Sequence, residues 1–234
     1  FPLHSRTASD AYGALQEFCG DVRPTRMYTD NAQELIRACK DLRFPHDTTT
    51  PHRHQSNAYC ERTVRKVIDG ARTILERAGL PACFWPFAVR FWCFMDNHIR
   101  DDSGDTAWNK RHQSGNFDMK LLAPFGSLVH FKLRPEAERA LPKFEPRGQP
   151  GILVGYRLHN GGKWARDYLV FPVSYFVDYD FNRPRNLLEL IPVTTKECII
   201  PPGIPQFPLK QRYDLFRNTV PLPNCIIPDI SHFT

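Results

Sequence analysis

Apolar residues recur with two different periods in the first part of the chain. At residues 9–19 they return at three- and four-residue steps, which predicts a short amphipathic helix. Residues 25–29 form a compact β-prone run that ends at Asp30, and helical spacing resumes at 33–42. The pattern therefore predicts a helix, a strand and a helix. Asp30 would lie at the carboxyl end of the strand, where catalytic groups collect in open α/β sheets.

A polar loop and a long helix are predicted next. Residues 48–57 contain a proline and have no period, which predicts a surface loop. Residues 58–78 carry an apolar stripe at helical spacing, and Gly79 closes the helix that this stripe predicts. Successive residues of a helix are about 100° apart. One edge of this helix, beside its apolar face, therefore carries Glu61, Arg65, Ile68 and Arg72.

Beyond this helix the pattern changes from helix to short strands. Residues 84–99 are apolar nearly all round, which predicts a buried helix with Pro86 in its first turn. Residues 101–115 are rich in polar breakers, and we expect a linker there. Strands are predicted at residues 126–133, 150–156, 168–172 and 174–178.

These elements define an α/β fold class with three parts. Residues 1–115 form the predicted core, and residues 116–182 form a small β-rich, barrel-like domain. Residues 183–234 are rich in proline and sustain no period, so we expect a Pro-rich tail or linker.

Composition adds a charge preference to this picture. The 234 residues carry 31 Lys and Arg against 25 Asp and Glu, a net charge of +6. This balance favours a polyanionic partner without establishing one. No apolar stretch is long enough to span a membrane, so we expect no membrane partner. The seven cysteines are spread widely and form no C-x-x-C pair, which argues against a zinc knuckle and for a reducing, intracellular compartment.

Asp30 and Glu61 are the candidate catalytic pair. One follows a predicted strand and the other lies early in a long helix, so folding could bring them together around divalent cations. Two-metal phosphoryl transfer needs such oxygen ligands, because one ion activates the attacking oxygen and the other stabilises the leaving oxygen. Judged by its spacing alone, an acid such as Glu61 is more often a solvated surface residue than a metal ligand.

Two sequence blocks around these acids carry a family resemblance. Residues 29–35 (Thr-Asp-Asn-Ala-Gln-Glu-Leu) resemble the T-D-N-G-x-E-F block of retroviral-type integrases. Residues 51–62 resemble the second block, P-[YH]-x-P-Q-[QS]-N-G-x-x-E-R. Farther on, residues 124–126 and 150–156 are similar to the β-domain that follows the core in copia-like retrotransposons. The resemblance covers about residues 1 to 180 and is of the copia-like kind.

The resemblance implies a ribonuclease-H-like integrase core that binds Mg²⁺ or Mn²⁺ through two aspartates and a glutamate. Asp30 would be the second and Glu61 the third of these carboxylates, so both would be catalytic. The first aspartate is expected on a strand before residue 1, because the chain starts without Met and looks like a cut segment. The resemblance therefore implies a truncated core, inactive by itself. Its full-length parent would join element ends to target DNA as a homo-oligomer in the nucleus.

The sequence departs from the family pattern at several positions. Ala32 and Ala58 stand where the family has glycine, and His54 stands where it has proline. The gap between Asp30 and Glu61 is also shorter than usual. Alanine replaces glycine without strain where φ is negative and costs stability where φ is positive. A degenerate copy of an integrase therefore stays open as an alternative.

Basic and amide side chains near Glu61 are candidate DNA contacts. If the integrase interpretation holds, the cations neutralise phosphates and the amides donate hydrogen bonds to backbone or bases. The candidate nucleic-acid-binding residues are Asn31, His52, Arg53, Gln55, Asn57, Arg62, Arg65 and Arg72. The alternative is a solvated helix face, which is favoured for Lys66 on the far side of the helix. In the β-rich domain, basic residues among aromatics suit either a nucleic-acid surface or a small barrel core.

Other functions fit the sequence less well. His52 and His54 lack the closed set of four ligands that zinc needs, and Cys60 lies in no nucleophile motif. Two rival functions remain open. One is a non-catalytic nucleic-acid-binding remnant of a transposon. The other is a ribonuclease-H-like nuclease outside the integrase group, which the Q-S-N-x-x-x-E-R run disfavours.

Overall fold

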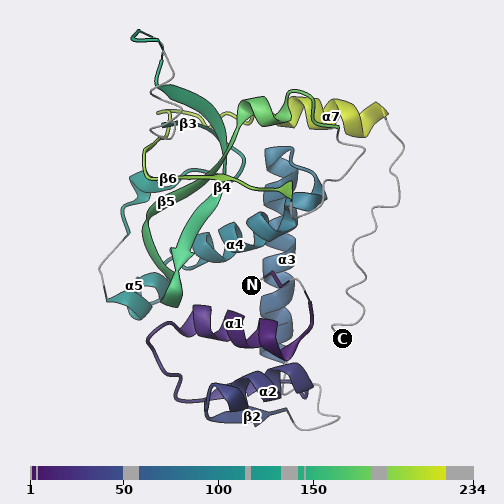
Figure 1. The fold of residues 1–234 in the computed structure, drawn as a ribbon, viewed down its shortest axis with the longest axis vertical. Coiled ribbons are helices and arrows are strands. Elements are labelled where there is room, and N and C mark those ends of the chain that lie inside the picture. Colours follow the sequence, from purple (N-terminus) through teal and green to yellow (C-terminus); the bar gives the residue numbers. More distant parts are fainter. Residues whose placement is uncertain are drawn as a thin grey trace.

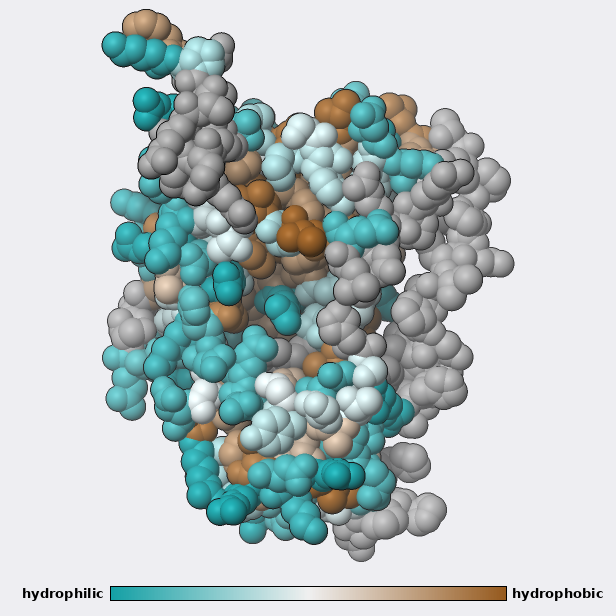
Figure 2. All heavy atoms as spheres, in the orientation of Figure 1, coloured by the Kyte–Doolittle hydropathy of each residue, from teal (hydrophilic) through white to brown (hydrophobic). Residues whose placement is uncertain are grey.

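The computed structural model describes residues 2–3, 5–49, 58–113, 117–132, 142–144, 146–180 and 189–219. Residues 8–48 lie at one end of the long axis, and the larger β-sheet lies nearer the other end (Figure 1). Hydrophilic residues cover most of the left and lower parts of the same face, and hydrophobic ones reach the surface in its upper middle (Figure 2). No helix within these ranges is long and apolar enough to cross a bilayer.

The N-terminal segment forms helix, strand, helix and strand. These elements are α1 (Ala8–Cys19), β1 (Met27–Thr29), α2 (Gln33–Asp41) and β2 (His46–Thr48). β1 and β2 pair in parallel, and α1 packs on α2, with Cys19 and Cys39 among the buried residues. The predicted order of helix, strand and helix is confirmed. β2 was not predicted, because three polar residues carry no local strand signal.

Three helical elements follow, namely α3 (Ala58–Ala78), the short 3-10 helix η2 (Ala82–Phe84) and α4 (Trp85–Asp96). The bounds of α3 are those that the sequence predicted, and Pro86 lies in the first turn of α4 as expected. The two long helices meet closely at Gly70, where a Cβ atom would lie 2.2 Å from the Trp92 ring. Side chains from Tyr59 to Lys66 are exposed. The core therefore holds only the second half of α3.

The larger sheet has five antiparallel strands in the order β6-β5-β4-β3-β7. They are β3 (Leu128–Lys132), β4 (Gly148–His159), β5 (Lys163–Pro172), β6 (Val193–Thr195) and β7 (Cys198–Ile199). Strands predicted at 126–133, 150–156 and 168–172 coincide with parts of β3, β4 and β5. The strand predicted at 174–178 is wrong, because Val173–Phe176 forms the 3-10 helix η5, which carries the buried Phe176.

Aromatic side chains join α4 to the sheet. Phe94 on α4 stacks on Tyr156 of β4 with ring centroids 4.4 Å apart, and Phe91 stacks on the same ring at 5.6 Å. Phe84 meets Phe171 of β5 edge-on at 5.5 Å. These buried rings belong to one hydrophobic cluster that includes residues of α3, α4, β3, β4 and β5. The domain boundary predicted near residue 115 thus separates two segments that share a core.

Arg111 ties the end of α1 to the tip of the β4–β5 hairpin. It lies on α5 (Ala107–His112), a helix within the segment predicted as a linker. Its Nε donates to the carbonyl oxygen of Gly161 at 3.1 Å, and its guanidinium also donates to the carbonyl oxygen of Phe18. The contact leaves no room for a side chain at Gly20, where a Cβ atom would lie 2.6 Å from the Gly161 nitrogen. The hairpin tip and α1 are therefore held together.

The segment predicted as a Pro-rich tail contains regular structure. It contributes β6 and β7 to the sheet and also forms α7 (Lys210–Thr219). On α7, Arg212 donates to the carbonyl oxygens of Phe176 at 2.5 Å and Tyr179 at 2.9 Å. Lys210 donates to Glu76 of α3 at 3.4 Å. These partners are distant in sequence, so no local period could reveal them. Residues 220–234 of the predicted tail lie outside the described residues.

We expect Phe94→Ala to destabilise the helices and the sheet together. Removing a fully buried phenylalanine ring costs ~3–5 kcal/mol, and the same cluster lies beneath both parts. Denaturant unfolding should show one earlier transition by both circular dichroism and tryptophan fluorescence. Val64→Ala, on the exposed half of α3, is the control and should change stability by less than about 0.5 kcal/mol. Two separate transitions would contradict a shared core.

A second expectation concerns pH and the buried His98. Burial lowers the pKa of His98 from its ordinary value of 6.5, and the nearby His112 lowers it further, while a hydrogen bond to the Phe94 carbonyl oxygen opposes the change. A histidine whose folded pKa is lowered stabilises the fold fully above its unfolded pKa and less as the pH falls below it. Unfolding free energy should therefore decrease from pH 7 to pH 5.

The variant that tests this expectation is His98→Phe, which keeps a ring against Phe94 and Trp108. The unfolding free energy of this variant should depend less on pH in this range. A smaller dependence should remain, because burial also lowers the pKa of His112. His130→Gln changes an exposed histidine on β3 and should leave the slope intact. An unchanged slope in His98→Phe would show that this ring does not cause the pH dependence.

Candidate functional site

Asp30 lies where the sequence placed it, directly after β1 and before α2. Its side chain is exposed, and its Oδ1 accepts a hydrogen bond from the backbone nitrogen of Ala32 at 3.3 Å. Ala32 is the N-cap residue of α2 with φ −64°. Ala58 is also absent from the residues with positive φ. Alanine therefore replaces the family glycine without backbone strain at both positions.

The residues around Asp30 fasten the end of β1 to the end of β2. Asn31 donates from its side-chain nitrogen to the carbonyl oxygen of Thr49 at 3.2 Å. Thr49 in turn donates its backbone nitrogen to the carbonyl oxygen of Thr29 at 2.9 Å. The Asn31 amide thus has a structural partner in the fold, and its contact with DNA stays a prediction.

A guanidinium that the sequence analysis did not single out lies near Asp30. Arg6 donates to the Glu34 carboxylate at 2.5 Å. This hydrogen bond is the main cause of a raised pKa for Arg6, and Asp30 contributes to the same shift by charge attraction. Backbone hydrogen bonding, followed by Arg6, holds the pKa of Glu34 below its ordinary value. Arg6 and Glu34 are 28 positions apart, too far for any local period to pair them.

Glu61 lies in the first turn of α3 and is exposed. An acid at this place is favoured by the positive end of the helix dipole. The axis of α3 runs along the molecule, and its first turns lie at the end occupied by α1 and α2 (Figure 1). The fold thus carries Glu61 toward the end that contains Asp30, although the two acids belong to different elements.

The basic residues of α3 differ in how they are paired. Lys66 donates to Asp96 of α4 at 2.6 Å. This residue, for which a DNA contact was not favoured, thus has an acidic partner within the fold. Arg72 pairs with Asp69 at 3.3 Å, and both side chains are more than half exposed, so the pair contributes little. Arg62 donates to the Ala58 carbonyl oxygen at 3.3 Å. Arg65 has no hydrogen bond or ion pair within the described part of the chain.

The remaining predicted contacts belong to the loop before α3. They are His52, Arg53, Gln55 and Asn57, and all four lie outside the described residues. Their roles stay predictions.

The described residues do not by themselves form a metal site. No group of three Asp, Glu, His or Cys side chains within the described ranges is arranged to hold a metal ion. Asp30 and Glu61 offer the oxygen donors that Mg²⁺ prefers, but a closed ligand set needs further donors. Mg²⁺ or Mn²⁺ binding therefore stays a prediction.

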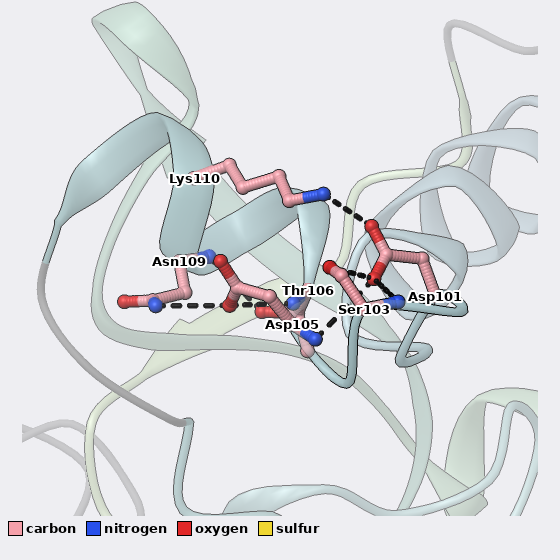
Figure 3. A network of polar contacts seen from close by, with 6 residues as sticks. All are labelled: Asp101, Ser103, Asp105, Thr106, Asn109 and Lys110. Atoms are coloured by element: carbon pink, nitrogen blue, oxygen red, sulfur yellow. Dashed lines mark hydrogen bonds and ion pairs between the residues drawn. The ribbon is translucent and has the colours of Figure 1, made fainter.

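The acidic turn after α4 already has its own cation. Asp101 accepts from the Ser103 backbone nitrogen at 2.9 Å and pairs with the ammonium of Lys110 (Figure 3). The Lys110 hydrogen bond is the first cause that holds the pKa of Asp101 far below its ordinary value. Asp105 accepts from the Thr106 backbone nitrogen at 2.7 Å in the same network. These hydrogen bonds order the turn that leads into α5.

No protein-family model matches the chain. Among curated proteins, it is 26% identical over 141 residues to the Retrovirus-related Pol polyprotein from transposon TNT 1-94 of Nicotiana tabacum, covering 56% of this chain and 10% of that polyprotein. It is 25% identical over 137 residues to the Retrovirus-related Pol polyprotein from transposon RE1 of Arabidopsis thaliana, covering 56% of this chain and 9% of that polyprotein. The chain thus matches about a tenth of the length of these relatives.

A solved structure with some likeness is the cryoEM structure of the simian T-cell lymphotropic virus intasome in complex with PP2A regulatory subunit B56 gamma. The match has a TM-score of 0.38 and 19% identity, and it covers 84% of this chain and 66% of that chain. The sequence relatives are the stronger finding. Homologues of this chain are Pol polyproteins of copia-like retrotransposons, which confirms the resemblance that the two motif blocks indicated.

Proposed function

We propose that this chain is part of a retrotransposon integrase, whose full-length parent catalyses metal-dependent polynucleotidyl transfer during DNA integration. The observation that carries the proposal is the similarity to two retrotransposon Pol polyproteins. The two motif blocks support it, since they place Asp30 and Glu61 in the order expected for the family. In such a reaction the parent trims element ends with water and then uses the exposed 3′-hydroxyl to attack target DNA.

The fold is assigned to this function in three parts. Residues 1–115 belong to a ribonuclease-H-like core that is incomplete in this chain. Residues 116–182 form the β-rich part that contacts DNA, and the Pro-rich segment 183–234 completes its sheet with β6 and β7. The helix and strand order around Asp30 and the antiparallel sheet support this assignment. The shared aromatic core implies that the first two parts move as one body.

Asp30 and Glu61 are proposed as two of three carboxylates that hold Mg²⁺ or Mn²⁺ in the parent. The bound ions would supply charge stabilisation at the reacting phosphate. Within this chain, Arg62, Arg65 and Arg72 neutralise the phosphates of the DNA backbone. Asn31 and the loop residues His52, Arg53, Gln55 and Asn57 add further contacts. Because target DNA is chromosomal, we expect the parent to act in the nucleus, as a homo-oligomer that holds both element ends.

A second candidate function is DNA binding without catalysis by a decayed element. The histidine at position 54, where the family has proline, and the short gap between Asp30 and Glu61 favour it. The negative φ at Ala32 and Ala58 counts against it, because these substitutions leave the local backbone unstrained. The encoding DNA upstream of Phe1 separates the two candidates. An in-frame β-prone run that ends in Asp supports the integrase, and a stop codon or frameshift supports the remnant.

The integrase proposal predicts that the isolated 234 residues do not transfer strands, whereas the full-length parent does. In the parent, Asp30→Asn or Glu61→Gln should lower the Mg²⁺-dependent rate by more than about a hundredfold, because each removes a charged metal ligand. Asp41→Asn changes an exposed acid at the end of α2 and should keep the rate. Strand transfer by the isolated chain would refute the proposed triad.

Charge changes on α3 should separate phosphate contacts from structural pairs. Arg65→Gln removes a cation without a described partner and should weaken binding of a duplex oligonucleotide by this chain and lower its salt dependence. Lys66→Gln removes the same charge from the neighbouring position, where Asp96 already holds it, and should change binding much less. Fluorescence anisotropy over a salt series measures both. Equal losses would show a general charge effect rather than a contact at Arg65.

A further inference from the structure

The β4–β5 ribbon contains a bulge, and an arginine of each strand lies within it. Tyr156 pairs with Tyr168 and Leu158 pairs with Trp164, so the register shifts between these pairs. One residue of β4, Arg157, and three residues of β5, with Arg166 in the middle, therefore lie between the same two pairs. Bulges bend and twist a ribbon and re-aim side chains, and they are over-represented beside functional sites.

Arg166 adopts a backbone conformation that costs free energy. Its φ is +64°, one of three positive values found outside glycine among the described residues. Glycine or asparagine would relieve the steric conflict that a long side chain meets in this region. Strained residues of this kind persist where the surroundings hold them, and they cluster at sites where a side chain must be presented.

Interactions beneath the bulge hold its shape. Asp167 follows Arg166 and is only 9% exposed. Its carbonyl oxygen accepts from the Trp164 indole at 2.9 Å, and its carboxylate meets Nε2 of His159 at 3.1 Å. The Trp164 ring packs edge-on against Tyr168 at 5.2 Å. Asp167 and the partly buried Trp164 are thus held by these contacts, whereas Arg166 itself is exposed.

Neither arginine has a partner within the described part of the chain. Both are exposed, and neither forms a hydrogen bond or an ion pair there. Asp167, the acid next to Arg166 in the chain, meets His159 at 3.1 Å. The surface around the lower part of the ribbon and α5 is hydrophilic on the face shown in Figure 2. Arg157 and Arg166 are therefore two exposed cations without an internal partner in the described part of the chain, and Asp167 beside Arg166 is buried.

We propose that Arg157 and Arg166 form a phosphate-binding site for the backbone of duplex DNA. The proposal rests on the proposed function and assigns residues to it outside the motif blocks. A guanidinium suits this task because it is always charged and can bind two phosphate oxygens at once. Base stacking is disfavoured as the means of contact, because the Trp164 ring packs against Phe94, Tyr156 and Tyr168. Binding at this site should therefore depend on salt and not on sequence.

The test uses the 234-residue chain and a duplex oligonucleotide of arbitrary sequence. Arg157→Gln combined with Arg166→Asn removes both cations, and asparagine tolerates the positive φ, so the fold should be at least as stable by thermal unfolding. The slope of log Kobs against log salt should decrease by about 0.9 for each phosphate that the variant no longer binds. Lys40→Gln combined with Arg100→Gln removes the same total charge from exposed positions outside the β-rich part and serves as the control.

The outcomes separate this proposal from the function on which it rests. A slope reduced by about 1.8 in the bulge variant, with the control unchanged, supports the site. An unchanged slope in the bulge variant, with weaker binding by Arg65→Gln, overturns the site and leaves the DNA-binding function standing. Equal effects of the bulge variant and its control overturn the site as well, and so does an effect seen only with single-stranded DNA. Failure of the unmodified chain to bind any duplex refutes both.

Discussion

The packing of α4 against the sheet is the constraint on which the rest of the structure depends. Phe94 and Phe91 stack on Tyr156, and Phe84 meets Phe171 edge-on. One side of α4 is therefore packed against the strands. Helix α3 is then placed by its close contact with α4 at Gly70. Because interiors are packed as densely as organic crystals, the direction of α3 follows from this contact. The exposed first half of α3, with Glu61 and its arginines, is carried by a helix whose other half is buried.

The candidate catalytic residues lie outside this core, and their positions follow from it indirectly. Asp30 is held by the short parallel pair of β1 and β2, which is fastened through Asn31. This end of the molecule is connected to the sheet by Arg111, which bridges α1 and the β4–β5 hairpin. Asp30 and Glu61 are thus exposed residues on elements that tertiary contacts hold in place.

The basic residues differ in whether they form ion pairs within the fold. Lys66, Lys110 and Lys210 contact acids that also join separate elements or order a turn. Arg65, Arg157 and Arg166 are exposed and unpaired within the described part of the chain. Net charge attracts a polyanion from a distance, whereas only cations free of internal partners can hold its phosphates without breaking an existing ion pair. The overall charge of +6 thus includes structural and available cations.

Local sequence determined the helices around Asp30 and the full extent of α3, because helical periodicity and the closing Gly79 are properties of neighbouring residues. It also marked Asp30 and Glu61 as candidates through two short motif blocks, and their catalytic role stays a prediction. Only the tertiary structure decided that residues 193–219 form β6, β7 and α7, and that 173–176 form η5 rather than a strand. Those elements are stabilised by distant partners such as Glu76 and Phe84. Contacts between residues far apart in sequence leave no period in the chain, and so the strained presentation of Arg166 was likewise visible only in the fold.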